Sequence, residues 1–190
     1  MSIGLSANKL KIGDILVRIC EQMPDIHLRK LLKVLYFIDE KSMIERAIPV
    51  TWLDYYAWKK GPVAPEVFEI KNGAFSDFVT CAKDSDGRYH INAKKYDDKF
   101  SQLSKYELQL VDDVIARCKD KSADELTDET HQEDTLWSRV VKENNIDFEK
   151  DSKSDVPILL VRLNEDDTEA QELYYEARDC VMMQASVNQM

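Results

Sequence analysis

One cluster in the sequence, at residues 128–133, has the residue types of a catalytic or metal site. It contains His131, Glu133 and two further carboxylates. An imidazole beside a carboxylate can act as the general base of a small hydrolase, but one histidine with scattered carboxylates makes a poor zinc site. A structural role fits better, because His131 follows a predicted helix whose free carbonyls and dipole suit its ring and charge. We therefore predict no catalytic residue, metal ion or cofactor, and keep hydrolysis by His131 and Glu133 as the least favoured alternative.

A second pair with nucleophile chemistry is Cys81 and His90, which would face each other across a predicted hairpin. A thiol beside an imidazole can form a nucleophile and its base. Nothing in the sequence indicates a third group that orients the histidine, so we interpret the pair as cross-strand packing. No Cys-x-x-Cys motif is present, and Cys20 and Cys118 lie on apolar helical faces where we expect them to be buried.

A third group of candidates is aromatic and suits recognition of a protein. At helical spacing Trp52, Tyr55 and Tyr56 share one side, whereas Trp58 points nearly the opposite way. One core face cannot bury all four rings, so either another layer covers the second side or some rings are exposed for a partner. In the second alternative a partner groove is lined by Trp52, Tyr55, Tyr56 and Lys59. In the first, Lys59 only compensates a helix dipole.

Two helices are predicted before these aromatic residues. Apolar residues at helical spacing indicate a helix from about 9 to 22, which Pro24 ends. Asp25 can cap the second helix, which carries a broad apolar face over 28–38 and should be the most buried helix. Three carboxylates near its end have the spacing of a solvated face: Asp39, Glu40 and Glu45.

The aromatic residues themselves are predicted to form a short helix from 52 to about 60, because Thr51 and Asp54 resemble a capping box. Gly61 is expected to end this helix with a positive φ, and Pro62 prevents its continuation. Pro65 is typical of the first turn of a new helix, where the acidic Glu66 favours the helix dipole.

Downstream, Asp86-Gly87 between two β-prone runs predicts a hairpin over 78–91. Capping boxes predict two helices, one from Ser104 to about Cys118 and one from Ser122 to near Thr130. A short helix follows from residue 134 or 135.

The expected fold is mainly α: a compact helical single domain with one small antiparallel hairpin and a C-terminal appendage. We predict a helical domain over 1–141, a polar linker or loop over 142–155, and the appendage over 156–190. In the appendage, 156–161 is a strand or a core-inserting coil, and a helix spans about 168–183.

The net charge of −10 lies entirely in the second half of the chain, since residues 101–190 carry −12 and residues 1–100 carry +2. An acidic surface is repelled by phosphate backbones, so nucleic acid is not expected as a partner of this chain alone. It would attract a basic protein, although surplus acid can also serve only solubility. No signal peptide or apolar run of membrane-spanning length is present, and we predict a cytoplasmic protein.

Three sequence blocks resemble the Panacea-domain antitoxins, also described as SocA-like and as phage-associated GepA-like proteins. The blocks are residues 30–37, 57–68 and 103–137, in matching order and spacing. The motif residues are Tyr36, Trp58, Gly61, Pro62, Pro65, Glu66, Thr130, His131 and Trp137.

This resemblance implies a mostly helical antitoxin that binds a cognate toxin directly, the toxin being encoded by an adjacent gene. It also implies an alternative, in which the protein is a proteolytic adaptor that hands the toxin to a Clp-type protease. Many relatives carry an added DNA-binding domain, and none is found in this sequence. Residues 142–190 lie outside the resemblance, and we hypothesise that they contribute partner specificity.

Overall fold

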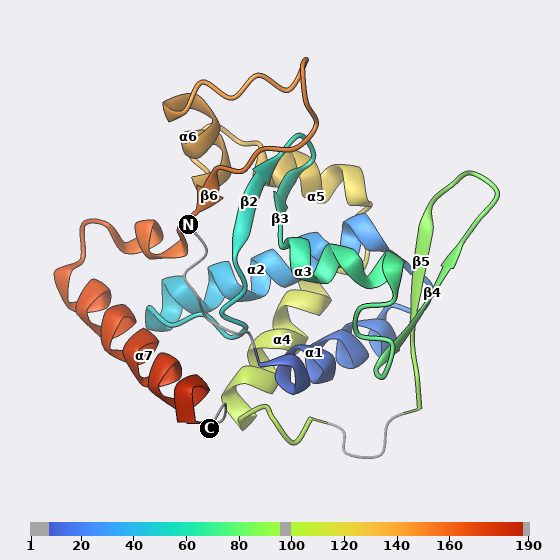
Figure 1. The fold of residues 1–190 in the computed structure, drawn as a ribbon, viewed down its shortest axis with the longest axis horizontal. Helices are drawn as coiled ribbons and strands as arrows, with labels where there is room; N and C mark the ends of the chain where they lie inside the picture. Colours follow the sequence, from blue (N-terminus) through green and yellow to red (C-terminus); the bar gives the residue numbers. More distant parts are fainter. Residues whose placement is uncertain (1–7, 96–99, 188–190) are drawn as a thin grey trace.

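A computed structural model describes residues 8–95 and 100–187 (Figure 1). The described chain is mostly helical, which confirms the expected fold class. Its helices are α1 (Lys9–Gln22), α2 (Leu28–Arg46), α3 (Pro65–Phe68), α4 (Lys105–Cys118), α5 (Ala123–Thr130), α6 (Leu136–Glu143) and α7 (Thr168–Val187), with 3-10 segments η1 (Glu69–Asn72) and η2 (Leu160–Asn164). Within this described part, no helix is both long and apolar enough to cross a membrane.

Two small antiparallel sheets lie among the helices. One has the order β1-β5-β4 and the other β3-β2-β6. The strands are β1 (Ile26–His27), β2 (Tyr55–Trp58), β3 (Gly61–Val63), β4 (Val79–Lys83), β5 (Tyr89–Ala93) and β6 (Pro157–Ile158). The predicted hairpin is confirmed as β4 and β5, which project from the body (Figure 1). The sequence did not indicate the second sheet.

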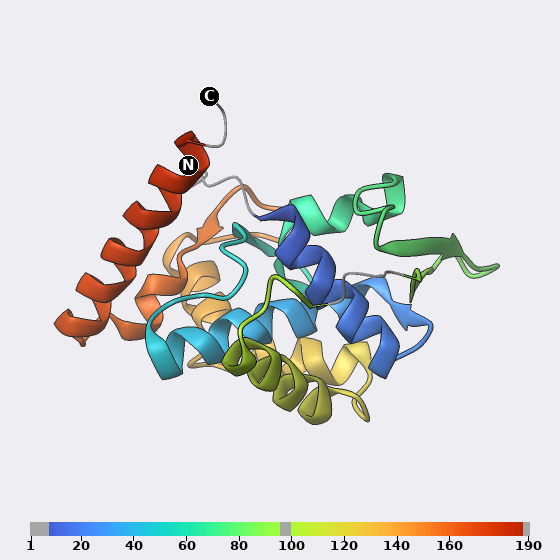
Figure 2. The same cartoon turned by 90° about the horizontal axis from the view of Figure 1, so that it is seen from below.

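The second helix is the centre of the fold, as predicted. Leu31, Val34, Leu35 and Ile38 of α2 are all 0% exposed, and α1, α4 and α5 surround this helix in both ribbon views (Figures 1 and 2). Each buried aliphatic side chain of this size contributes roughly 1.5–3 kcal/mol to folding. Helix α2 therefore holds the core together.

Helix boundaries were predicted best where a side chain caps the helix. The boxes at Ser104 and Ser122 both form, each serine accepting from the N3 amide while the N3 glutamate accepts from the serine amide. Thr135 caps α6, and Pro65 occupies the first turn of α3 as expected. These local contacts satisfy amides that the helix itself leaves unpaired, so neighbouring sequence is enough to fix them.

The Asp25 cap is wrong. Residues 26–27 instead form β1 beside β5, and His27 precedes α2 without any side-chain cap. The Asp25 carboxylate is used across the hairpin, where it lies 2.8 Å from His90 Nδ1 and accepts from Asn92. A long-range contact therefore replaces the expected local one.

The short helix over 52–60 is also wrong, since β2 occupies this segment. Trp52 has φ +57°, which a right-handed helix does not allow. The Thr51 hydroxyl donates to Asp39 rather than serving a capping box with Asp54. In a strand alternate residues face opposite sides, and Tyr55 accordingly points into the core while Tyr56 is only half-buried.

The segment after residue 155 belongs to the same core as the rest of the chain. Ile158 pairs with Tyr55 in the second sheet and is 3% exposed, and Leu160 is 6% exposed. Residues 156–161 were expected to form either a short strand or a segment inserted into the core. They contain both, since β6 is a short strand and Leu160 is buried. The predicted last helix is confirmed as α7 and lies at the edge of the molecule (Figure 2).

Candidate functional site

Residues from each of the three sequence blocks meet at a buried junction between α2, the β2–β3 turn and the end of α5. Lys33 is 1% exposed, and its Nζ donates to the carbonyl of Pro62 at 3.1 Å. Gly61 lies against this ammonium group with φ +95°. Thr130 completes the junction, and its hydroxyl donates to the Thr127 carbonyl at 2.8 Å.

Gly61 is required here for two separate reasons. Its positive φ follows the two-residue turn of Lys59 and Lys60, a position at which glycine is favoured. A methyl group at Gly61 would also lie 2.6 Å from Thr130 Oγ1 and closer still to Lys33 Nζ. The positive φ was predicted correctly, but Gly61 connects two strands and does not end a helix.

Beside the junction, three rings stack in parallel. The His131 and Trp137 ring centroids are 3.8 Å apart, and those of Trp137 and Phe148 are 5.8 Å apart, each pair inclined by 8°. The Trp137 indole donates to the Trp58 carbonyl at 3.1 Å, which ties α6 to β2. The motif tryptophans therefore act as packing elements that join distant segments.

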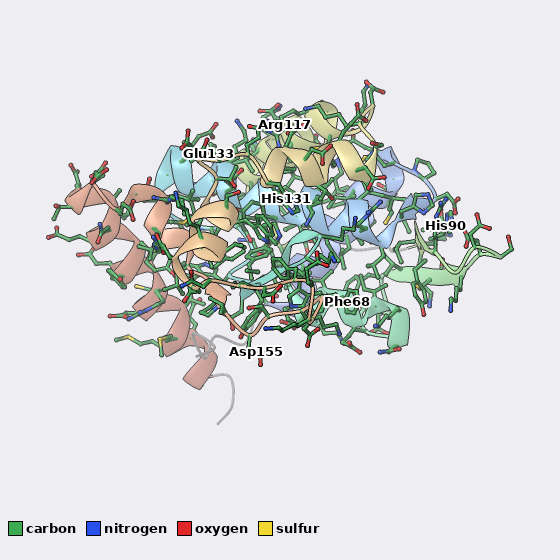
Figure 3. The ribbon with its side chains drawn as sticks, turned by 90° about the horizontal axis from the view of Figure 1, so that it is seen from above. Phe68, His90, Arg117, His131, Glu133 and Asp155 are labelled. Atoms are coloured by element: carbon green, nitrogen blue, oxygen red, sulfur yellow. The ribbon has the colours of Figure 1, made fainter. Side chains whose placement is uncertain are left out.

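Within the described chain, the ring of His131 does not make the contact with helix-end carbonyls that was predicted for it. His131 ends α5, its carbonyl accepts from Ser138 Oγ, and its Nε2 is buried without a hydrogen bond among the described residues. Burial lowers the pKa of His131, and the nearby Lys33 lowers it further, so the expected favourable charge at the helix end is not supported. Glu133 is exposed (Figure 3). Among the residues described, no group of three or more potential ligands is arranged to hold a metal ion.

Lys33 is the most unusual ionisable group in the junction. Burial lowers its pKa to about 7, with a smaller contribution from Arg29. A buried lysine whose charged form is destabilised weakens folding at neutral pH. In the sequence, this burial is indicated by the position of Lys33 inside the apolar run Leu31–Leu35. Lys33 was interpreted there only as part of the first sequence block.

A second buried polar cluster surrounds Asp39, which is 0% exposed and so contradicts its assignment to a solvated face. Its carboxylate accepts from the Thr51 amide at 2.8 Å, from the Thr51 hydroxyl, and from the Tyr55 hydroxyl at 2.8 Å. Burial raises the pKa of Asp39, although these hydrogen bonds act in the opposite direction. The cluster fixes the segment that leads into β2.

Tyr55 belongs to this cluster and is 1% exposed, so its ring lies inside the core and not on the predicted partner surface. We expect Tyr55→Phe to lower the free energy of unfolding by about 1–2 kcal/mol, because it removes one hydrogen bond to a buried carboxyl group. Urea denaturation measures this change. The matched control is the exposed Tyr175→Phe, which should change stability by less than about 0.5 kcal/mol; equal losses in the two variants would contradict the assignment.

The pair Cys81 and His90 does not form. The register places Cys81 opposite Ile91 and His90 opposite Ala82, and burial raises the pKa of the Cys81 thiol. His90 lies between two carboxylates, 2.8 Å from Asp25 and 2.9 Å from Asp84, and hydrogen bonding to Asp84 raises its pKa. Figure 3 shows His90 on the hairpin, well away from His131. Its role is to tie the hairpin to the start of α2.

The other predicted partner residues do not form one groove. The half-buried Trp52 ring lies 5.4 Å from the Tyr174 ring of α7. Lys59 is exposed, and its Nζ donates to the Phe148 carbonyl at 3.2 Å. Trp58, whose ring was expected to point away from the other three, is half-buried, with its ring 4.9 Å from Phe68 and beneath the Lys153 ammonium group at 4.6 Å.

A sequence model of one protein family, described as antitoxin SocA-like, Panacea domain, matches residues 31–138. The match spans more than half of the 190 residues and runs from α2 into α6. It includes the whole buried junction, whereas β6, η2 and α7 lie beyond it. The chain matches no curated protein and no solved structure.

Proposed function

The chain belongs to the SocA-like, Panacea-domain antitoxin family, and we propose that it neutralises a cognate toxin by binding that toxin directly. The observation that carries this proposal is the family match across residues 31–138, which confirms the resemblance of the three sequence blocks. Family membership implies a toxin as the partner. Direct binding is the part of the mechanism that we add.

The buried groups in the matched segment support binding rather than chemistry. Lys33 and Asp39 are 1% and 0% exposed and are hydrogen-bonded within the core. The His131 ring is stacked on Trp137. Groups enclosed in this way position the surface elements, whereas a catalytic group must reach its substrate. We therefore propose a non-catalytic antitoxin.

Three of the predicted partner residues remain available to a toxin. Trp52 and Tyr56 are half-buried and Lys59 is exposed. Aromatic side chains that keep part of their surface exposed are frequent anchors of protein interfaces. We propose that these three side chains contact the toxin, whereas the buried Tyr55 does not.

Co-expression with the neighbouring reading frame tests the proposed function. If that frame encodes the toxin, its expression alone should arrest growth, and co-expression of this chain should restore it. The two purified proteins should also form a complex in gel filtration. Rescue without any complex would contradict direct binding.

The same assay separates the alternatives. An adaptor would lose its rescue in a host that lacks Clp proteases, whereas a direct binder keeps it. A hydrolase would lose all function in His131→Ala while the fold stays intact. Tyr56→Ala and Lys59→Glu, assayed beside them, test the exposed face of β2.

A further inference from the structure

Helix α7 carries an unusual share of the apolar surface. The large hydrophobic residues that are exposed in the described chain number eight, and four of them lie on this one helix. They are Leu173 (43% exposed), Tyr175 (42%), Met182 (40%) and Met183 (70%). Scattered exposed hydrophobics need no explanation, but a concentration on one element is typical of an interaction surface.

One side of α7 faces a groove beside the C-terminal end of α2. This groove has a volume of about 240 Å³, and its walls include Ile44 and Arg46 from α2 and Glu169, Ala170 and Leu173 from α7. Ile44 is 64% exposed, so the groove has an uncovered apolar side chain on each wall. The groove is open, and charged side chains, among them Glu45, Asp167 and Glu169, line it beside these apolar ones.

The apolar character continues along α7 beyond the groove. Residues seven and ten positions after Leu173 lie on the same side of a helix, and these are the exposed Cys180 and Met183. Tyr175, two residues after Leu173, faces nearly the opposite way. Ile44, Leu173, Cys180 and Met183 are the exposed apolar side chains on this side, with the exposed Glu176 among them. We call these four residues the α2–α7 strip.

The α7 helix is held firmly enough to present this strip. Tyr174 is 5% exposed and packs on Trp52, while the Gln171 side chain donates to the Asn164 and Glu165 carbonyls. Asn164 in turn donates to the Met43 carbonyl on α2 at 2.9 Å. A surface that is held in place before binding costs less entropy on association.

The negative charge of α7 indicates which kind of partner can bind the strip. Glu169, Glu172 and Glu176 lie on or beside this side of α7 and form no ion pair within the described part of the chain. Arg46 is the one basic residue among the described residues that line the groove, so a second copy of this protein would bring more carboxylates than cations together and be repelled. A partner helix with apolar residues at the centre and lysine or arginine at its edges would instead complement both features, in the helix-in-groove mode of recognition.

We propose that the α2–α7 strip binds a basic amphipathic helix of the toxin, in addition to the contacts proposed for Trp52, Tyr56 and Lys59. This inference rests on the proposed function, because it names a further surface that the antitoxin uses. It also assigns a role to a helix that lies outside the family match. Trp52 then supports the interface by holding Tyr174.

Two variants, one within the strip and one on the other side of α7, test the proposal. Leu173→Ser combined with Ile44→Ser should weaken binding of the purified neighbouring toxin at least tenfold in isothermal titration, because it removes two apolar anchors. Tyr175→Ser removes an equally exposed side chain from the other side of the same helix and should change the dissociation constant less than threefold. Thermal unfolding of all variants checks that the fold is kept.

Cys180 provides a second measurement on the complex. It is exposed, whereas Cys20 and Cys118 are buried and Cys81 is half-buried. In a Cys81→Ala background, maleimide should label Cys180 in the free protein and much more slowly when the toxin is bound. Unchanged labelling together with full binding by the double variant would overturn the strip while leaving the proposed function intact. No complex with wild-type protein would instead reject direct binding. A strip-dependent dimer in light scattering would show that a second copy is the occupant.

Discussion

Lys33→Met is expected to make this protein more stable at neutral pH. The buried ammonium group has a pKa of about 7 against an ordinary value of 10.5, a difference that costs about 4 kcal/mol of folding free energy at pH 7. Methionine keeps the aliphatic contacts but leaves the Pro62 carbonyl without its donor, which costs about 1–3 kcal/mol. We expect a net gain of about 2 kcal/mol in urea denaturation.

The pH dependence identifies the cause of this gain. Because the folded-state pKa of Lys33 is lowered, the unfolded chain binds more protons than the folded chain between pH 7 and the ordinary pKa of 10.5. The free energy of unfolding of the wild type should therefore rise with pH relative to that of the variant. The advantage of Lys33→Met should be largest at pH 7 and below, and should shrink towards pH 10.5.

The control is Lys150→Met, because the Lys150 side chain is 85% exposed. Its effect on the free energy of unfolding should stay below about 0.5 kcal/mol. A destabilised Lys33→Met would show that Lys33 is charged and well stabilised in the junction. A gain that does not change with pH would show that a lowered pKa of Lys33 is not its cause. Natural proteins often retain a destabilising buried group where function requires it, so toxin binding should be measured on this variant as well.

Gly61→Ala should have the largest destabilising effect in the junction. Placing a side chain at φ +95° costs about 1–2 kcal/mol, and its contacts with Lys33 and Thr130 add an overpacking cost of about 1–3 kcal/mol. We expect a total loss of about 2–5 kcal/mol in the free energy of unfolding. Gly61→Val should be worse, because a β-branched residue resists positive φ more strongly.

Two other glycines separate the contributions. Gly73 has φ +97° and nothing within 4 Å of an added methyl group, so Gly73→Ala measures the backbone cost alone. An added methyl group at Gly13 would overlap the Phe78 ring without any positive φ, so Gly13→Ala measures the packing cost. If Gly61→Ala costs no more than Gly73→Ala, the close approach to Lys33 and Thr130 does not restrict residue 61.

The sequence predicted local structure correctly where that structure depends on residues a few positions apart. The capping boxes at Ser104 and Ser122 and the hairpin at Gly87 each depend on residues a few positions apart, and all three form. The prediction was wrong where a residue distant in the sequence determines the conformation. Thr51 and Asp54 have the pattern of a cap, but the carboxylate of Asp39 takes both the amide and the hydroxyl of Thr51.

The candidate site shows the same division. Gly61 and His131 were recognised as structural residues, although the lysine that contacts Gly61 was recognised only as part of a motif. Periodicity assigns a residue to a face of its helix, but it does not show which carbonyl or ring that residue meets from another segment. A helix could not bury the four rings between Trp52 and Trp58 on one face, but in the structure Tyr55–Trp58 form a strand, whose side chains alternate between two faces. One strand that pairs with it, β6, lies about 100 residues later in the sequence.

That pairing has a consequence for the newly made chain. One edge of β2 pairs with β3 and the other with β6, where Tyr55 lies opposite Ile158. Elongation at roughly 5–20 residues per second separates β2 and β6 by roughly 5–20 s of synthesis. During that interval the nascent polypeptide presents an open strand edge beside Tyr56 and Trp58. Molecular chaperones at the ribosome exit, or a toxin translated from the same message, therefore meet this protein first in a form with an incomplete sheet.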